Sequence, residues 1–272
     1  MAQPMQQVQP TSNSTMPQAI YEQAYAHQLG APVATYKPPL TNPLAIIGVV
    51  LGAIVLDILV LYGILAATGY IFYILIAIPI AAIGYGVVAM LNYNLAIYQF
   101  MNGLVRAKGQ QVEVVRWDRI SALWIRMNRR RNYSLSGALA SSLASGNTIQ
   151  GLTLQRDDGR NFSFSSLLRG HLRLIQSIEQ NMVQFHLPRA TAAYQSGQVV
   201  PFGPLSVSRQ GISNGRETLG WNEVQNIEIN RGNLLVKRSP KGAKWASVDV
   251  AKIPNLAVFV SLTSGVRSGQ IL

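Results

Sequence analysis

Residues 44–91 decide the fold, and they read LAIIGVVLGAIVLDILVLYGILAATGYIFYILIAIPIAAIGYGVVAML. Asp57 is the only charged residue among them. The hydrocarbon core of a bilayer needs about 20 apolar residues of helix, and residues 44–67 and 70–91 both reach that length. A soluble core helix this long would carry a polar stripe, and neither run has one. The sequence therefore predicts two membrane-spanning helices separated by a short break.

The break between the two apolar runs is too short to hold a domain, so we expect a tight helical hairpin with both chain ends on one side. The segment after residue 93 holds 22 Lys and Arg residues but only 9 Asp and Glu residues, so it carries a large excess of positive charge. Three of these cations, Arg106, Lys108 and Arg116, follow the second helix closely. Excess Lys and Arg near spanning helices stays cytoplasmic. We therefore predict a multi-pass protein of the cell membrane with both termini in the cytoplasm.

The composition of the whole chain excludes several classes of protein. Of 272 residues, 49% are hydrophobic and 12% are charged, whereas charged residues make up about a quarter of a typical soluble domain. No cysteine occurs, which excludes disulfides, thiol catalysis and cysteine-ligated metal sites. The formal net charge of +12 favours anionic partners.

The N-terminal segment, residues 1–42, is rich in Gln, Pro, Ser, Thr and Asn and carries only Glu22 and Lys37 as charges. Such a segment buries too little apolar surface to offset the entropy lost on ordering, so we predict a disordered N-terminal arm. One part of it, Gln18–Leu29, lacks Gly and Pro and is compatible with a short helix.

Small residues and one carboxyl group mark the interior of the predicted hairpin. Gly48 and Gly52 allow close helix packing, either within the hairpin or between two copies of the chain. Asp57 lies opposite Gly48 at about 100° per residue, and an intramembrane carboxyl is a functional candidate. We expect a neutral carboxyl, hydrogen-bonded either to the Leu75 carbonyl that Pro79 frees or to its own copy in a dimer.

The segment after the hairpin predicts short strands followed by a helix. Alternating apolar residues, typical of half-buried strands, occur at Val112/Val114, Leu152/Leu154 and Phe162/Phe164. The turn residues Asp157-Asp158-Gly159 predict a hairpin between the last two strands. Apolar residues spaced by threes and fours predict a helix from Leu168 that ends at Pro188 and covers the sheet.

A second, shorter copy of this pattern follows. Residues 100–105 (FMNGLV) and 115–120 (VRWDRI) correspond to residues 208–213 (SRQGIS) and 219–224 (LGWNEV). Each copy has a Gly before an apolar residue, then a Trp followed by Asp or Asn, any residue and a β-branched aliphatic residue. Further strands are predicted at Ile227/Ile229, Leu234–Arg238 and Trp245–Val250, and a closing helix at Pro254–Leu262 with Pro in its first position.

This repeat, with its trailing helix, resembles the bacterial pleckstrin-homology (PH-like) domains. A closer similarity, to an uncharacterised family of bacterial membrane proteins, rests on residues 201–221 (PFGPLSVSRQGISNGRETLGW), 245–248 (WASV) and 253–256 (IPNL). The resemblance implies a membrane hairpin plus PH-like modules, and it carries over no catalytic or ligand residue. Residues 128–148 depart from this pattern, because they stand where a plain hairpin is expected. The register of the strands there therefore stays open.

The predicted fold class is therefore a membrane α-helical hairpin with cytosolic β-rich (α+β) domains, each a small bent PH-like sheet closed by a C-terminal helix. The predicted parts are a disordered arm at 1–42, the transmembrane hairpin at 43–93, a PH-like unit at 94–188, a linker at 189–203 and a second PH-like unit at 204–272.

No catalytic constellation is visible in the sequence. His27, His171 and His186 do not cluster, because the last two lie about 22 Å apart along the predicted helix. The pair Asp157-Asp158 is better explained as a solvated turn than as paired catalytic carboxylates. Metal-binding, nucleotide-binding and nucleophile motifs are absent from the sequence. We therefore predict no enzyme, no metal and no cofactor, and an enzyme would need an unrecognised long-range site.

Basic residues are the stronger functional signal. The predicted lipid-binding residues are Arg126, Arg129, Arg130, Arg131, Lys237, Arg238, Lys241 and Lys244. Each cation near an anionic leaflet contributes about 1 kcal/mol, and a domain tethered by the hairpin stays in that field. The alternative is that these cations only fix the topology of the chain.

We predict a non-enzymatic, membrane-anchored binding or scaffold protein whose partners are membrane lipids with anionic headgroups. A protein partner that adds to an exposed sheet edge is the alternative. Nucleic acid fits less well, since neither a helix-turn-helix nor an aromatic stacking pattern occurs. The sequence leaves homo-oligomerisation open.

Overall fold

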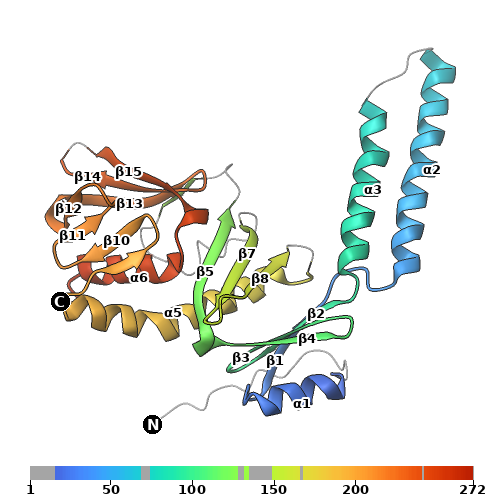
Figure 1. Cartoon of the computed structure of the whole chain (residues 1–272). Helices are drawn as coiled ribbons and strands as arrows, with labels where there is room; N and C mark the ends of the chain where they lie inside the picture. The colour runs from blue at the N-terminus through green and yellow to red at the C-terminus, as the bar shows by residue number, and fades with distance from the viewer. Residues whose placement is uncertain are drawn as a thin grey trace, which may run out of the picture. The chain divides into compact units, whose positions relative to one another are not determined.

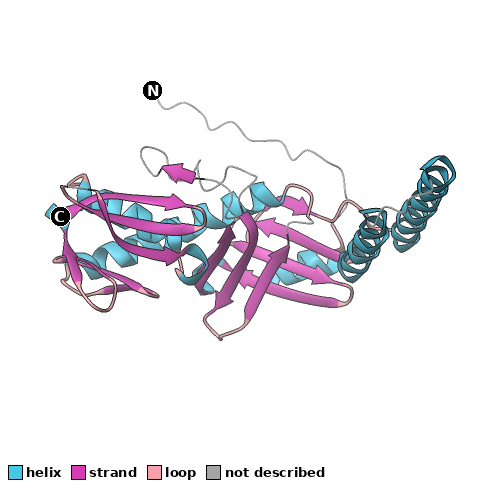
Figure 2. Cartoon of the chain, turned by 90° about the horizontal axis from the view of Figure 1, so that it is seen from above, coloured by secondary structure: helices cyan, strands magenta, loops and turns pink. Residues whose placement is uncertain are grey.

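The computed structural model describes residues 16–68, 74–127, 132–134, 149–165, 168–240 and 242–271. These residues form α-helices and several antiparallel sheets, so the predicted mixed α+β class is confirmed at that level (Figures 1 and 2). Two compact units are present. The hairpin unit comprises Met1–Val114 with Leu167–Arg169, and the C-terminal unit comprises Val115–Ser166 with Gly170–Leu272.

The sheet of the hairpin unit is an antiparallel meander in the order β1-β2-β3-β4. Its strands are β1 (Pro32–Tyr36), β2 (Leu95–Phe100), β3 (Gly103–Lys108) and β4 (Gln111–Arg116). Helix α1 (Gln18–Ala26) packs on one face of this sheet. Its Ile20 and Ala24, one turn apart, are buried in a cluster with Tyr98 of β2.

The order of α1 and β1 corrects the prediction for the N-terminal arm. The predicted short helix is confirmed, whereas the predicted disorder is wrong over residues 18–36. Tertiary packing of a few apolar side chains stabilises α1 despite its polar composition, and β1 gains the backbone hydrogen bonds of its pairing with β2. Residues 1–15 lie outside the described residues.

Two apolar helices, α2 (Pro43–Thr68) and α3 (Ile74–Asn92), run side by side as a hairpin (Figure 1). Asn42 caps α2, because its Oδ1 accepts a hydrogen bond from the Leu44 amide at 2.9 Å. Gly86 allows the helices to approach closely, since a methyl group on it would lie 2.5 Å from Val50 Cγ2.

Many apolar side chains of this hairpin are exposed. They include Leu44, Ile47, Val49, Leu51, Val55, Leu56, Ile58, Leu59, Val60 and Tyr62 of α2 and Ile80, Ile83, Tyr85, Val87, Val88, Met90 and Leu91 of α3. In the described part of the chain, one helix is long and apolar enough to cross a membrane, over Pro43–Gly63, and only 11% of its apolar window is buried. The apolar stretch Pro79–Asn92 is shorter. Both predicted helices are thus present, and a length sufficient for spanning is found for the first of them.

The seam between α2 and α3 shows which small residues face inward. Asp57 of α2 and Gly86 of α3 are buried. Gly48 and Gly52, in contrast, have no described neighbour within 4 Å of the position that a methyl group would take. The glycine pair is therefore exposed in the described part of the hairpin, whereas Gly86 packs closely against α2.

The C-terminal unit begins with a three-stranded sheet in the order β5-β7-β8. Its strands are β5 (Ile120–Met127), β7 (Ile149–Arg156) and β8 (Asn161–Ser165). The predicted turn at Asp157-Asp158-Gly159 joins β7 to β8. Gly159 adopts a φ of +81°, the left-handed conformation that such a turn requires.

Helix α5 (His171–Gln195) follows β8 and is longer than predicted. The predicted helix end at Pro188 is wrong, because Pro188 lies inside α5. A proline removes one hydrogen bond from a helix interior, and the burial of Ala190 and Tyr194 beyond it offsets that loss. Part of the predicted linker at 189–203 is therefore helical.

The rest of the C-terminal unit is the second copy of the repeat, in which strands are again followed by a helix. Its sheets have the orders β12-β11-β10-β9 and β15-β14-β13-β6. The strands of the second copy are β9 (Val200–Phe202), β10 (Leu205–Ser208), β11 (Gly211–Ser213), β12 (Thr218–Gly220), β13 (Val224–Asn230), β14 (Asn233–Arg238) and β15 (Ala243–Asp249). Helix α6 (Leu256–Arg267) closes the copy and packs on α5. Its predicted start at Pro254 is too early, because Asn255 is its N-cap.

The repeated sequence motif occupies the same structural position in both copies. Gly103 and Gly211 are the first residues of β3 and β11, and each closes a two-residue turn. The 3-10 helices η1 (Trp117–Arg119) and η2 (Trp221–Glu223) begin at the Trp of the motif. Each follows the last strand of a four-stranded sheet and leads into a strand of another sheet, β5 for η1 and β13 for η2.

Each copy also covers a sheet edge of the other. The short strand β6 (Asn132–Ser134), which follows β5 in the first copy, pairs with β13 of the second copy. In return, Asn255 of the second copy hydrogen-bonds to Leu123 of β5. β6 belongs to the segment 128–148 that departs from the expected pattern, so this insertion supplies a strand to the second copy. The other residues of that segment lie outside the described ones.

Candidate functional site

Two of the predicted lipid-binding cations are neutralised on β14. Lys237 Nζ lies 2.9 Å from Glu228 Oε1, and Arg238 Nε lies 3.5 Å from Glu223 Oε1. Lys244 of β15 is exposed and lies opposite Lys237 in the sheet. A cation with a carboxylate partner gains less from an anionic lipid, because the carboxylate repels the headgroup. The structure therefore brings these three cations together, but on a surface of mixed charge.

The other predicted lipid-binding residues are not brought together with this group. Arg126 is exposed and belongs to a different sheet, where it pairs with Gly151 across β5 and β7. The predicted residues Arg129, Arg130, Arg131 and Lys241 lie outside the described residues. The described structure therefore places no single patch that contains the predicted set.

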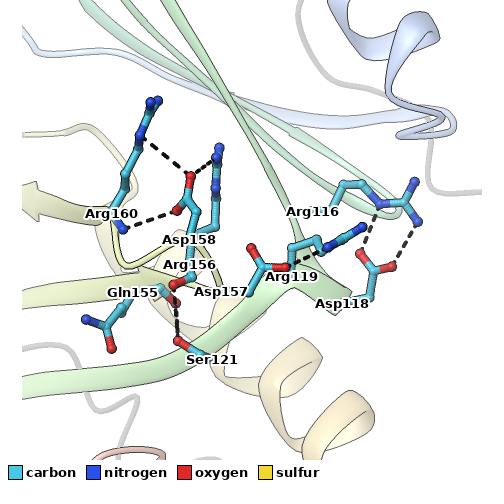
Figure 3. A network of polar contacts seen from close by, with 9 residues as sticks. All are labelled: Arg116, Asp118, Arg119, Ser121, Gln155, Arg156, Asp157, Asp158 and Arg160. Carbon is cyan, nitrogen blue, oxygen red and sulfur yellow. Dashed lines mark hydrogen bonds and ion pairs between the residues drawn. The ribbon is translucent and has the colours of Figure 1, made fainter.

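A network of charged residues links η1 to the turn between β7 and β8 (Figure 3). Arg119 Nη1 lies 2.8 Å from Asp157 Oδ2, and the Asp157 amide donates to the Arg119 carbonyl at 2.9 Å. Arg116 Nε lies 2.9 Å from Asp118 Oδ1, and this hydrogen bond lowers the pKa of Asp118. Exposed ion pairs individually contribute little to the free energy of folding. The network therefore mainly orients η1, which connects β4 to β5.

The same turn holds a second cluster. Asp158 forms ion pairs with Arg156 and with Arg160, the latter at 3.6 Å (Figure 3). The arginines around η1 and this turn thus have carboxylate partners, and they are not available as an anion-binding patch. The network is structural in character.

Three exposed cations lie at the end of the first sheet from which the apolar helices leave, and we call them the hairpin-base cations. Lys37 directly follows β1 and precedes α2 by six residues. Lys108 ends β3, opposite Leu95 at the start of β2. Arg169 lies beside Lys37, because its amide donates to the Lys37 carbonyl at 2.9 Å. In the described part of the chain none of the three forms an ion pair.

None of the hairpin-base cations is among the predicted lipid-binding residues. Lys108 enters only the topology prediction, through its closeness to the second helix, and the position of Lys37 just before Pro43 is a comparable signal. Nothing local in the sequence marks Arg169, because a hydrogen bond between distant segments brings it there.

Helix α5 of the C-terminal unit carries a buried glutamate and a half-buried histidine. Glu179 is 5% exposed, its Oε1 has no hydrogen-bond partner among the described residues, and burial raises its pKa to about 8. His186 lies two turns further on the same face. Its buried Nε2 also has no partner in the described part, and burial lowers the pKa of its imidazole. Among the described residues, no group of three or more His, Asp or Glu could hold a metal ion.

A pocket of about 740 Å³ opens between α1 and the first sheet. Its lining is mostly apolar and includes Tyr21, Tyr25, Pro32 and Phe100. Pro32 pairs with Phe100 at one end of the β1–β2 ladder, and Tyr36 lies at the other end. The apolar helices leave from the Tyr36 end, so the pocket lies away from them. Among the described residues that line it there is no acid, histidine or cysteine, and the lining offers contact area for an apolar group.

Asp57, the predicted intramembrane polar residue, lies in the seam of the hairpin. It is 8% exposed, and its Oδ1 has no hydrogen-bond partner among the described residues. The hydrogen bond predicted for it, to the Leu75 carbonyl or to a second copy, stays a prediction.

Comparison with known proteins gives a family and no function. A family model described as a family of unknown function (DUF6585) matches residues 1–271. The match therefore includes the apolar helices and both copies of the repeat. No curated protein matches the chain, and no solved structure matches it.

Proposed function

The chain belongs to DUF6585, a family of unknown function, and we propose that it is a non-enzymatic membrane anchor that holds two PH-like binding modules at an anionic cytoplasmic membrane surface. In this proposal α2 and α3 both cross the bilayer. Both termini then lie in the cytoplasm. The binding modules act by recognising lipid, and catalysis plays no part.

The observation that carries the proposal is the exposed apolar surface of α2. This helix has 26 residues, or about 39 Å at 1.5 Å per residue, which exceeds the roughly 30 Å of a hydrocarbon core. A contiguous exposed apolar surface of this extent is unfavourable in water and favourable in lipid. Helix α3 has 19 residues, or about 28 Å, which is close to the thickness of the core.

The order of elements supports the PH-like part of the proposal. Twice along the chain, a four-stranded antiparallel meander is followed by a 3-10 helix, further antiparallel strands and a closing α-helix. The motif residues that suggested a PH-like domain stand at the joints of this arrangement. A binding role also agrees with the pocket between α1 and the first sheet, whose lining is mostly apolar.

Membrane fractionation of the full chain tests the anchor. We expect the chain to stay in the membrane pellet after alkaline carbonate treatment and to become soluble only in detergent. The variant Val55→Lys/Leu59→Lys places two lysines on the exposed face of α2, at about 2.5–3.5 kcal/mol each near the helix centre, and it should be released. The matched variant Thr218→Lys/Ser247→Lys, exposed in the C-terminal unit, should behave like the parent. Release of the parent chain by carbonate would contradict the proposal.

A further inference from the structure

We infer that the hairpin-base cations, Lys37, Lys108 and Arg169, form a binding site for the phosphate groups of anionic membrane lipids. This inference rests on the proposed insertion of the hairpin into a bilayer. It replaces the predicted cations of β14 and β15 as the main lipid contact. The ligand class is a phospholipid headgroup with a net negative charge.

The position of Lys108 follows from the connections of the chain. Lys108 lies opposite Leu95, and Leu95 comes three residues after Asn92, the end of α3. Three extended residues span about 10 Å, and paired strands lie about 5 Å apart. The backbone of Lys108 is therefore within about 15 Å of the end of α3. The headgroup layer extends roughly 5–8 Å beyond the hydrocarbon core, so Lys108 lies close to this layer when α3 spans the core.

A backbone hydrogen bond joins Lys37 to Arg169. The Arg169 amide donates to the Lys37 carbonyl at 2.9 Å, and both side chains are exposed. The preceding residue, Tyr36, is buried, and its hydroxyl donates to Gln99 Oε1 at 3.0 Å. Two cations held at adjacent backbone positions repel each other. A phosphate group that contacts both removes this repulsion and forms charge-assisted hydrogen bonds.

The contrast with other cations of the same sheet supports the assignment. Arg106, on the same strand as Lys108, has an acidic partner, since its Nη1 lies 3.0 Å from Glu113 Oε2. The hairpin-base cations have no acidic partner in the described part of the chain. Their place at the exit of the apolar helices favours a headgroup of the surrounding bilayer over a free phosphate ion.

Lipid selectivity of the full chain tests the inference. The chain is reconstituted in phosphatidylcholine vesicles with a trace of spin-labelled phosphatidylglycerol or spin-labelled phosphatidylcholine, and electron paramagnetic resonance gives the ratio of their association constants. We expect the parent chain to prefer phosphatidylglycerol. The variant K37Q/K108Q/R169Q should lower this ratio by roughly fivefold or more, the effect of losing even one cation at an anionic surface.

Matched variants separate the site from general charge. The variant K37R/K108R/R169K keeps the charges and should keep the preference. The variant R216Q/R231Q/K252Q removes three exposed cations from the C-terminal unit and should also keep it. An unchanged ratio in K37Q/K108Q/R169Q, or an equal drop in R216Q/R231Q/K252Q, would overturn the inference.

Further measurements distinguish a lipid from a free phosphate ion and a failed site from a failed membrane anchor. Inorganic phosphate should not reduce the preference more than chloride at the same ionic strength, and a selective loss would overturn the assignment to lipid. The single variants K37Q and K108Q, which alter exposed residues, should each lower the ratio if the triple variant does not fold. Carbonate resistance of the parent chain is measured separately, so a failed site and a failed anchor give different results.

Discussion

Asn255 and Leu123 exchange two hydrogen bonds across a sequence separation of 132 residues. The Leu123 amide donates to Asn255 Oδ1 at 2.9 Å, and the Asn255 amide donates to the Leu123 carbonyl at 2.8 Å. Asn255 Nδ2 also donates to the Ser121 carbonyl at 3.2 Å. One residue thus satisfies backbone groups at the edge of β5 much as a neighbouring strand would. It joins a strand of the first copy to the helix that closes the second.

Replacing this asparagine should weaken the C-terminal unit. We expect Asn255→Ala to lower the free energy of unfolding by about 2–3 kcal/mol, because backbone groups of β5 lose their partners and alanine disfavours the left-handed conformation. Asn255 has a φ of +53°. Urea unfolding of the full chain in detergent micelles, followed by tryptophan fluorescence, measures this change. The chain has four tryptophans, all in the C-terminal unit: Trp117, Trp124, Trp221 and Trp245.

A glycine at the same position separates the two causes. Asn255→Gly loses the side-chain hydrogen bonds but not the backbone conformation, so it should cost about 1 kcal/mol less than Asn255→Ala. An Asn255→Ala variant within about 0.5 kcal/mol of the parent would show that the two copies do not depend on this contact.

The glycine of the repeated motif should tolerate no side chain in the second copy. Gly211 has a φ of +148°, and a methyl group there would collide with the Leu219 carbonyl oxygen. We expect Gly211→Ala to cost about 3 kcal/mol or more, from backbone strain and overpacking together. Gly215 also has a positive φ, +81°, but faces open space, so Gly215→Ala should cost only about 1 kcal/mol. Equal losses in the same unfolding assay would refute the argument.

Close packing of the apolar hairpin should depend on Gly86. A valine at this position would clash with Val50 of α2, so Gly86→Val should lower the amount of dodecyl sulfate needed to unfold the helices in mixed micelles, followed by circular dichroism. Gly84 has open space around it, and Gly84→Val should have little effect. The double variant Gly86→Val/Val50→Ala should recover part of the loss. No recovery would mean that the two helices do not meet at these residues.

Burial of Glu179 predicts a specific pH dependence. Its pKa is raised to about 8 from a usual value of 4.5, so the folded state holds this proton more tightly than the unfolded state. Its contribution to stability is complete below about pH 4.5, falls as the pH rises and is lost above about pH 8, a change of about 5 kcal/mol. Glu179→Gln cannot ionise, so it should match the parent near pH 4.5 and be more stable than it above pH 8.

The difference in stability between the parent and Glu179→Gln separates the effect of Glu179 from that of the other titratable groups. The pKa of His186 is lowered, so its own contribution is lost as the pH falls below about 6.5, and it affects both chains equally. Urea midpoints of parent and variant from about pH 4.5 to 9 supply the comparison. Parallel curves across this range would mean that Glu179 is not buried as an uncharged acid.

Features set by local pattern could be predicted from the sequence. The apolar runs of 44–91 gave two helices, and the alternation and turn residues around Asp157-Asp158-Gly159 gave β7 and β8. The Gly and Trp positions of the repeat marked turns and joints because each motif depends on nearby backbone geometry.

Features that depend on contacts between distant segments could not be predicted from the sequence. Residues 32–36 form β1 because β2, beyond the apolar helices, supplies a partner. Helix α5 continues through Pro188 because Ala190 and Tyr194 are buried beyond it. The carboxylate partners of Lys237 and Arg238 depend on the register of β13 and β14 or on packing beside them, so charge counting alone could not show that these cations are paired.

The central claim, that both apolar helices cross a bilayer and leave the folded parts on the cytoplasmic side, can be tested by cysteine labelling, since the chain has no cysteine. Single cysteines are placed at Gln28, Gly69 and Ser247, and a membrane-impermeant maleimide is added to intact cells. We predict that Gly69→Cys is labelled in intact cells, whereas Gln28→Cys and Ser247→Cys are labelled only after permeabilisation. Labelling of Ser247→Cys in intact cells, or protection of Gly69→Cys until permeabilisation, would contradict the account.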